Sequence, residues 1–504
     1  MAARSRGAWW AVAALVLATL TGGFDITVLN VALPTIGSQL GAGTTALQWM
    51  VNAYVLVFAC LILPMGAAGD RWGRRRVLLG GLALFTAGSV LAAWAGGAAL
   101  VIAARAVMGA GMAMVLPMTL ATLAVLFPSP QERSRAVAAV IAATGLGVPL
   151  GPLVGGWLLE RHWWGSVFLI NVPIAIAALA AIAVLVPESA DPAPPRADFT
   201  GAALAVAGLA GFTYAVTQAP LRGWGSPAVL STLLVGLSLL TVLVAWERRT
   251  DHPLIEGALF RNRSFAGGSG AAAIAGVALF ALLFVIPMYL QLVRGHAPMG
   301  TGLRLLPVVL GLVVGAAAGD GLARWRGHRA PVVLGLLLVS VALAVGAGTG
   351  VGTGYGLVAA WLTAAGVGIG MALAPATDAV LDALPPHRSG TGTALAMTIR
   401  YVGGSLGVAV LGAVLSEGFT DRLDLTGVPA QLTGTAEGSL GGALAVAQRT
   451  SNPQLTADAV TAFMHGMSLV LIVCCVVCLV GAAAVAAALP AKQRLRATSE
   501  RVSP

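Results

Sequence analysis

Apolar residues occur along this sequence in long runs, which are separated by short stretches of charged or turn-forming residues. A helix needs about twenty apolar residues to cross the hydrocarbon core of a bilayer. Fourteen runs of about that length predict fourteen transmembrane helices, and hence an all-α integral membrane protein. The predicted spans are residues 10–33, 47–68, 77–95, 98–120, 136–158, 167–187, 200–219, 227–246, 266–290, 302–319, 331–350, 355–376, 391–415 and 463–489.

Composition supports a membrane protein rather than a soluble one. Of the 504 residues, 58% are hydrophobic and only 10% are charged, whereas soluble domains carry roughly 25% charged residues. The 65 glycines suit closely packed transmembrane helices, because Gly lets two helix backbones approach each other.

The cations give the predicted spans an orientation, because basic residues concentrate in the cytoplasmic loops of membrane proteins. With a cytoplasmic N-terminus, 21 of the 29 cations fall on the cytoplasmic side, six fall outside and two lie within spans. This bias predicts that both termini are cytoplasmic, which requires an even number of spans. The net charge of +10 is therefore spread along one membrane face and does not indicate nucleic-acid binding.

Two features could be mistaken for other functions. The first apolar run resembles a signal peptide, but no cleavage pattern ends it, so we expect a retained span. The cysteine cluster Cys474, Cys475 and Cys478 lies in an apolar run without His or acidic partners at metal-ligand spacing. We expect these cysteines, like Cys60, to act as small packing residues and to bind no metal.

Asp25, in the segment FDITVLNVALP (residues 24–34), is a carboxylate well inside the first span. An ionised carboxylate is costly in hydrocarbon, and acids at such positions usually mark proton or ion pathways. We expect Asp25 to bind a proton. The alternative is a structural Asp that hydrogen-bonds to neighbouring helices.

The segment GAAGDRWGRRR (residues 66–76) joins the second and third spans. We expect Gly66 and Gly69 to allow close helix approach and Gly73 to allow a tight turn. The aspartate can pair with a cation or lie against a helix N-terminus, and the arginines can pair with acids or lipid phosphate. A plain basic loop would explain the arginines but not this spacing. The residues of the motif are Gly66, Asp70, Arg71, Gly73 and Arg74.

Arg105 is a cation within the fourth span, about seven residues from its outer end, while Asp25 is about eight residues from the outer end of the first span. At about 1.5 Å per residue, the two depths agree within about 2 Å. One expectation is therefore a buried ion pair. The other is that the Arg105 side chain extends outward to the membrane interface.

The segment GLGVPLGPLVGG (residues 145–156) places three glycines at intervals of four residues along one face of the fifth span. We expect this face to pack closely against another helix, and Pro152 to introduce a local bend. A generic packing face would explain the glycines alone, but the Gly-Pro placement is more specific. The residues of the motif are Gly147, Gly151, Pro152, Gly155 and Gly156.

Other segments carry weaker signals. Residues 366–370 (GVGIG) lie within the twelfth span and do not form a nucleotide loop. His296 and His465 are expected to have surface or packing roles, and Arg400, within the thirteenth span, has no evident partner. Residues 416–462 are polar and are expected to form a partly helical loop outside the membrane, without a catalytic constellation.

Taken together, these motifs resemble the major facilitator superfamily, and specifically its fourteen-span drug:proton antiporter family. Residues 24–34 resemble the first-span motif, residues 66–76 the loop 2–3 motif, and residues 145–156 the fifth-span antiporter motif. Arg105 with Gly109 resembles the fourth-span motif. Later segments that agree are HWWGSVFLINVPI (162–174), HPLIEGALFRNRSF (252–265), YLQLVRG (289–295) and RSGTGTAL (388–395).

The resemblance implies two six-helix bundles around a central cavity, with two further helices between them. The implied parts are 1–187 (N-terminal bundle), 188–199 (cytoplasmic linker), 200–246 (two inserted helices), 247–265 (cytoplasmic loop), 266–489 (C-terminal bundle, including the extracytoplasmic loop 416–462) and 490–504 (cytoplasmic tail). Residues 319–329 occupy the place of the loop 2–3 motif in the second bundle but depart from its pattern. Asp320, Asp378 and Glu160 lie only at span edges, which leaves Asp25 as the chief proton-site candidate.

In function, the resemblance implies export of drugs, antibiotics or other amphipathic small molecules in exchange for protons, by alternating access. Asp25 would bind and release the proton, with Arg105 as its ion-pair partner. Asp70, Arg71 and Arg74 would hold the cytoplasmic side closed. The expected partners are protons, membrane lipids and the substrate, with no nucleic acid and no cofactor beyond the proton gradient. A monomer in a bacterial cytoplasmic (inner) membrane is expected, and the high Ala, Gly and Arg content with one Lys is typical of a GC-rich bacterial gene.

Alternatives on the same fold are a proton-coupled uptake symporter and an exporter of lipid-like substrates. The antiporter-type motif of the fifth span argues against the symporter. A membrane enzyme is not supported, because the sequence offers no nucleophile–base set, metal cluster or nucleotide loop.

Overall fold

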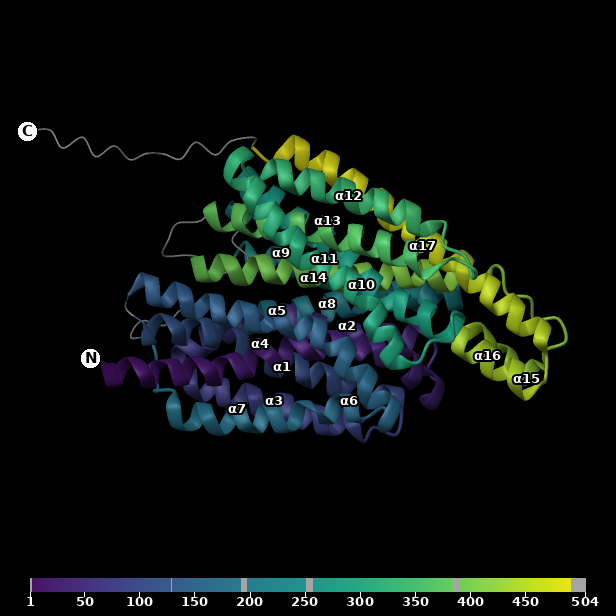
Figure 1. Ribbon diagram of the computed structural model, residues 1–504, viewed down its shortest axis with the longest axis horizontal. Coiled ribbons are helices and arrows are strands. Elements are labelled where there is room, and N and C mark those ends of the chain that lie inside the picture. Colours follow the sequence, from purple (N-terminus) through teal and green to yellow (C-terminus); the bar gives the residue numbers. More distant parts are fainter. Residues whose placement is uncertain (1, 128, 192–196, 251–256, 384–388, 491–504) are drawn as a thin grey trace, which may run out of the picture.

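The computed structural model describes residues 2–127, 129–191, 197–250, 257–383 and 389–490. Fourteen of its helical segments are long and apolar enough to cross a membrane, which agrees with the fourteen predicted spans. The helices run roughly along one direction (Figure 1). The N-terminus and the end of α17 lie at one end, here called the terminal end, and α15 and α16 lie at the other, here called the distal end.

The first half of the molecule is a bundle in which α1 packs along α5 and α7, and α4 packs along α2 and α3. Its helices are α1 (Ala2–Leu40), α2 (Thr44–Trp72), α3 (Arg74–Ala93), α4 (Ala98–Leu126), α5 (Pro130–Arg161), α6 (Ser166–Leu169) and α7 (Asn171–Leu185). The first helix continues to Leu40, beyond the predicted end of its span at residue 33, so Pro34 lies inside the helix. Proline is tolerated within transmembrane helices, where neighbouring helices compensate for the lost hydrogen bond.

The second half is a bundle in which α13 packs against α11 and α12, and α17 packs against α12 and α14. Its elements are η1 (Gly257–Arg261), α10 (Arg263–Met288), the π-helical turn η2 (Tyr289–Val293), α11 (Pro298–Arg326), α12 (Arg329–Ala347), α13 (Tyr355–Asp382), α14 (Ser389–Thr420), α15 (Ala430–Gly438), α16 (Leu440–Arg449) and α17 (Pro453–Ala488). The segment predicted as a partly helical loop, 416–462, is mostly helical. The predicted tail lies outside the described residues from 491 onward.

Two helices, α8 (Phe199–Arg222) and α9 (Pro227–Glu247), stand between the halves in sequence and pack on each other. They match the two predicted inserted spans. The Thr45 hydroxyl of α2 donates to the carbonyl of Thr217 at 3.3 Å, and α8 also contacts α14. The inserted pair therefore lies beside the junction of α2 with α14.

The halves meet along α2 with α14 and along α5 with α11. On α14, Thr398 and Ser405 bond to α2: the Thr398 hydroxyl donates to the carbonyl of Ala59 at 3.1 Å, and the Ser405 hydroxyl donates to the amide oxygen of Asn52 at 3.2 Å. Seven residues separate Thr398 from Ser405, so both side chains lie on one face of α14. This polar seam lies next to the candidate site.

Candidate functional site

Asp25 and Arg105 form a buried ion pair. An Nη1 hydrogen of Arg105, on α4, is donated to the Asp25 carboxylate on α1. The side chain of Asp25 is 0% exposed and that of Arg105 only 1% exposed. Of the two expectations, the ion pair is confirmed, and the extension of Arg105 to the interface is wrong.

Three further residues complete this site. The Asn171 amide of α7 donates to the second carboxylate oxygen of Asp25 at 3.0 Å. The Nε of Arg105 donates to the carbonyl of Met50 at 3.1 Å, and its guanidinium carbon lies 4.3 Å from the ring centroid of Tyr54. A buried ion pair needs such additional partners, because its Coulomb attraction alone seldom offsets the cost of removing both charges from water.

Sequence reasoning missed these partners, although Asn171 lies in the quoted segment 162–174. A lone amide near one end of an apolar span is a signal that could have singled it out. Met50 contributes only its backbone carbonyl, so no side chain marks it. Tyr54 lies among apolar residues of the second span, and only the fold brings its ring against Arg105.

Two polar atoms of the site keep unused hydrogen-bonding capacity. Within the described residues, neither the Tyr54 hydroxyl nor the Asn171 amide oxygen has a hydrogen-bond partner, and both are buried. Most buried polar atoms in proteins are paired, so unpaired ones beside an ion pair point to a functional environment. They can bond to a polar group that enters the site.

The glycine motif of α5 packs against the part of α1 that carries Asp25. A Cβ built on Gly147 would lie 2.7 Å from the backbone nitrogen of Phe24, and one on Gly151 would lie 2.8 Å from that of Val28. A Cβ on Gly155 would lie 2.7 Å from a methyl carbon of Val28. The expected close packing is therefore confirmed, and the partner helix is α1. Only glycine permits α5 to approach α1 this closely at the residues that precede and follow Asp25.

The other face of α5 packs against α11 of the second half. A Cβ on Gly156 would lie 2.6 Å from the Cα of Met299. In return, a Cβ on Gly302 would overlap the carbonyl oxygen of Pro152. The Glu160 carboxylate accepts a hydrogen bond from the backbone N–H of Met299 at 3.1 Å. Helix α5 thus connects the Asp25 site to the junction between the halves.

The motif between α2 and α3 forms a tight turn at the terminal end. Gly73 has φ +103°, which favours glycine, and the Asp70 carboxylate accepts hydrogen bonds from Arg74 at 2.7 and 2.9 Å. Arg71 is exposed. The close approach expected at Gly66 is wrong, because a Cβ there would meet Pro117 only at 3.8 Å. The close approach expected at Gly69 is confirmed, because a Cβ there would overlap the Met118 side chain.

The segment after α7 binds to this turn. The backbone N–H of Arg74 donates to the carbonyl of Ser189 at 2.8 Å, and that of Arg75 donates to the Glu188 carboxylate at 3.1 Å. The N–H of Asp191 donates to the carbonyl of Asp70 at 2.9 Å. The start of the predicted linker 188–199 is therefore held on the turn, and residues 192–196 of it lie outside the described residues.

The corresponding turn of the second half is built differently, as its departure from the motif suggested. Gly327, with φ +74°, separates α11 from α12. The His328 ring nitrogen lies 3.0 Å from the Asp382 carboxylate of α13. In place of the Asp–Arg pair within the turn, this turn has a contact between His328 and helix α13.

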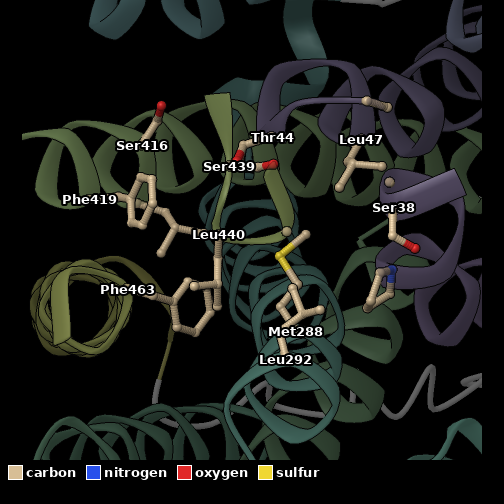
Figure 2. Close-up of a pocket in the computed structure, with 15 residues that line it drawn as sticks. Ser38, Thr44, Leu47, Met288, Leu292, Ser416, Phe419, Ser439, Leu440 and Phe463 are labelled. Carbon is tan, nitrogen blue, oxygen red and sulfur yellow. The ribbon is translucent and has the colours of Figure 1, made fainter. Parts of the chain in front are cut away.

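A pocket lies at the distal end, beneath the start of α16 (Figure 2). Segments far apart in the sequence form it, so the sequence did not predict it. Its lining is apolar or hydroxyl-bearing, without a charged side chain. The residues labelled in Figure 2 are Ser38, Thr44, Leu47, Met288, Leu292, Ser416, Phe419, Ser439, Leu440 and Phe463.

No metal centre is found where the structure describes the chain, since it contains no group of three or more potential metal-ligating side chains there. The cysteines are free, and Cys60, Cys474 and Cys478 are buried. Among the residues that the structure describes, the Asp25–Arg105 contact is the one ion pair whose two side chains are both fully buried.

The chain belongs to the Major Facilitator Superfamily, which it matches over residues 15–408. It is 33% identical to the multidrug efflux pump LfrA of Mycolicibacterium smegmatis over 488 residues, covering 95% of this chain and 96% of that protein. It is 31% identical to the methyl viologen resistance protein SmvA of Salmonella typhimurium, covering 87% and 89% of the two chains.

Solved structures agree on the fold. The crystal structure of a bacterial homolog of the human lysosomal transporter Spinster, in an inward-facing and unoccupied conformation, covers 96% of this chain and 97% of that one. The TM-score is 0.66 and the sequence identity 15%. From the family match and its fourteen membrane-crossing helices, the protein is a multi-pass membrane transporter of this superfamily.

Proposed function

We propose that the protein exports drugs or other amphipathic small molecules in exchange for protons, by alternating access. The observation that carries the proposal is the buried Asp25 carboxylate, which is 0% exposed and paired with Arg105 and Asn171. Intramembrane acids of this kind usually serve proton or ion movement. The names of the relatives, which include multidrug efflux pumps, support the substrate class and the direction.

The chemistry of the pair explains how a proton can change the structure. Arginine stays protonated in proteins, whereas a carboxyl can be neutral or charged. A proton on Asp25 removes the negative charge and leaves the Arg105 cation buried with only Met50 and Tyr54 as partners. The protonated and deprotonated forms therefore favour different packings of α1 against α4, and a ligand that prefers one packing couples to the proton.

The remaining motifs supply the moving parts of this proposal. The Asp70–Arg74 pair and its turn would latch the terminal end, and the glycines of α5 would let helices seal at the junction between the halves. The cation distribution supports cytoplasmic termini in a bacterial inner membrane. The protein would act as a monomer among membrane lipids, with the proton gradient as its energy source and without nucleic acid or another cofactor.

The proposal is tested in proteoliposomes with an imposed pH gradient and a panel of cationic, neutral and acidic aromatic dyes. Substrate-dependent proton movement and dye transport are measured for the parent protein, for Asp25→Asn and for Asp421→Asn. Asp421 is exposed, so this control makes the same chemical change outside the site. We expect gradient-driven transport to be lost in Asp25→Asn alone. Transport at the parent level in Asp25→Asn would refute the assignment of Asp25.

A further inference from the structure

A second arginine lies at mid-depth of the molecule, in the other half. Arg400 belongs to α14, and its backbone carbonyl and Cγ would lie 2.9 and 3.4 Å from a Cβ built on Gly276 of α10. The neighbouring Tyr401 ring contacts Phe58 of α2, with ring centroids 5.0 Å apart. Gly276 and Phe58 both lie near the middle of their helices. Arg400 therefore lies near the middle of the length of these helices.

Arg400 has no anionic partner within the described residues. No ion pair involves it there, and its Nε is buried without a hydrogen-bond partner. Its guanidinium carbon lies 5.5 Å from the Tyr401 ring centroid, which is a weak contact. Arg105 differs from Arg400 in having three partners for its cation. These are the carboxylate of Asp25, the carbonyl of Met50 and the closer ring of Tyr54.

The half-buried guanidinium of Arg400, which has no anionic partner in the part of the chain that the structure describes, is able to bind an anion from outside the protein. Arginine does not lose its proton, so Arg400 cannot become neutral. Asp25 is already engaged by Arg105 and Asn171. A lipid phosphate is also an unsuitable partner, because Arg400 lies near the centre of its bundle's depth rather than at a helix end, where such side chains reach the interface. The remaining source is a ligand that enters between the halves.

The surroundings of Arg400 indicate what else such a ligand carries. Tyr401 is partly exposed and contacts both Phe58 and Phe280, whose ring centroids lie 5.0 and 6.1 Å away. Phe58 stacks in turn on Tyr54 at 6.1 Å, and Tyr54 contacts Arg105. A line of aromatic rings thus joins Arg400 to the Asp25–Arg105 pair. Aromatic rings favour flat apolar ligands through offset or edge contacts.

We propose that Arg400 is a substrate-binding residue for aromatic amphipathic molecules that carry an acidic oxygen group, such as a carboxylate. The guanidinium would bind the anionic group, by two parallel hydrogen bonds where the group is a carboxylate. The partly exposed ring of Tyr401 would contact the apolar body, and the buried rings of Phe58 and Phe280 would support Tyr401 from behind. This inference rests on the proposed function, since it names a substrate class for the exporter. It also places the ligand close to the proton site, at the other end of the aromatic line.

Ligand binding is measured on the full chain in nanodiscs, with pyrenebutyrate and pyrenebutanol as a matched pair of probes. The two share ring and chain and differ in the anionic group. Quenching of the protein's tryptophans by the pyrene ring reports binding, and protein-free nanodiscs correct for partition into lipid. The variants are Arg400→Gln and Arg400→Lys. Arg449→Gln serves as the control, because it removes the same charge from an exposed position on α16.

The parent protein is expected to bind the acid more tightly than the alcohol. Arg400→Gln should weaken pyrenebutyrate binding by about tenfold or more and pyrenebutanol binding by less than about twofold, because only the acid loses a charge-assisted hydrogen bond. Arg400→Lys should retain part of the preference, since it keeps the charge and loses the paired geometry. Arg449→Gln should leave both affinities unchanged.

Equal losses for both probes in Arg400→Gln, or no preference for the acid in the parent protein, would overturn the inference. The ratio of the two affinities is taken within each protein sample, so a partly unfolded variant does not alter it. Binding requires no gradient. Failure here therefore remains distinct from failure of the Asp25→Asn transport test.

Discussion

The substitution Gly151→Ala tests whether the contact between α5 and α1 holds the Asp25 site in place. An alanine Cβ would lie 2.8 Å from the backbone nitrogen of Val28 and 2.9 Å from the carbonyl oxygen of Phe24. Backbone atoms cannot rotate aside as the end of a side chain can. The two helices must therefore separate, and the residues that flank Asp25 must move with α1.

Gly145 of the same helix provides a matched control. A Cβ there would meet nothing within 4 Å, so Gly145→Ala makes the identical chemical change in open space. In a helix, replacing Gly by Ala at an unstrained position stabilises by roughly 0.5–1 kcal/mol, because the unfolded chain loses freedom.

The expected difference between the two variants follows from the contact distances. Ordinary van der Waals contact begins at 3.4 Å, so the Cβ of the Gly151 variant is about half an ångström too close to these backbone atoms, and it also overlaps the Thr27 hydroxyl oxygen. Overpacking of this kind costs about 1–3 kcal/mol. The gain from replacing glycine by alanine is common to both variants, so the difference in the free energy of unfolding should equal the overpacking cost, about 1–3 kcal/mol.

Two measurements decide the matter, the thermal unfolding midpoint in nanodiscs and gradient-driven transport in proteoliposomes. Gly151→Ala should unfold at a clearly lower temperature than Gly145→Ala and should transport more slowly, whereas Gly145→Ala should equal or exceed the parent protein in stability. Equal midpoints and equal rates for the two variants would refute the packing argument, because the contacts then exert no constraint.

Two further predictions concern other polar groups. Asn171→Ala removes the hydrogen-bond donor to one Asp25 oxygen. It should lower the free energy of unfolding by about 1–3 kcal/mol and shift the pH dependence of transport. An unchanged denaturation curve together with an unchanged pH profile would contradict this prediction. His296, in the connection before α11, has its pKa lowered by burial and by the nearby Arg304 and Arg294. A lowered pKa means that protonation favours the unfolded state, so stability is full above the ordinary value of about 6.5 and falls as the pH drops below it. Histidine NMR of selectively labelled protein should show this low pKa, which Arg304→Gln should raise; no change in Arg304→Gln would exclude the electrostatic cause.

The number of spans could be predicted from the sequence because the bilayer sets the length of each apolar run. Helix ends could not, since they depend on compensation from neighbours. Helix α1 continues through Pro34 to Leu40. The distal segment held a missed signal, because Leu440, Ala443 and Ala447 recur at helical spacing and are buried.

The candidate site was predictable only where depth along a helix suffices. The pairing of Asp25 with Arg105 could be predicted because their distances from the span ends agree. That comparison needs no knowledge of helix packing. Asn171 and the Met50 carbonyl enter the site through the arrangement of α7 and α2 around α1, which no local pattern encodes. The unpartnered Arg400 was visible in the sequence, but its aromatic surroundings come from three helices.

Helix α5 has the position needed to join the two halves mechanically. Its glycines at 147, 151 and 155 leave no gap to α1, and Gly156 leaves none to Met299 of α11. A rigid helix without free space on either face cannot absorb a displacement of its neighbours, because packed interfaces switch between arrangements rather than deform gradually. A movement of α11 relative to the first half must therefore shift α5, and with it the stretch of α1 that carries Asp25. On this argument, the same glycines that close the junction also carry its motion to Asp25, the proposed proton site.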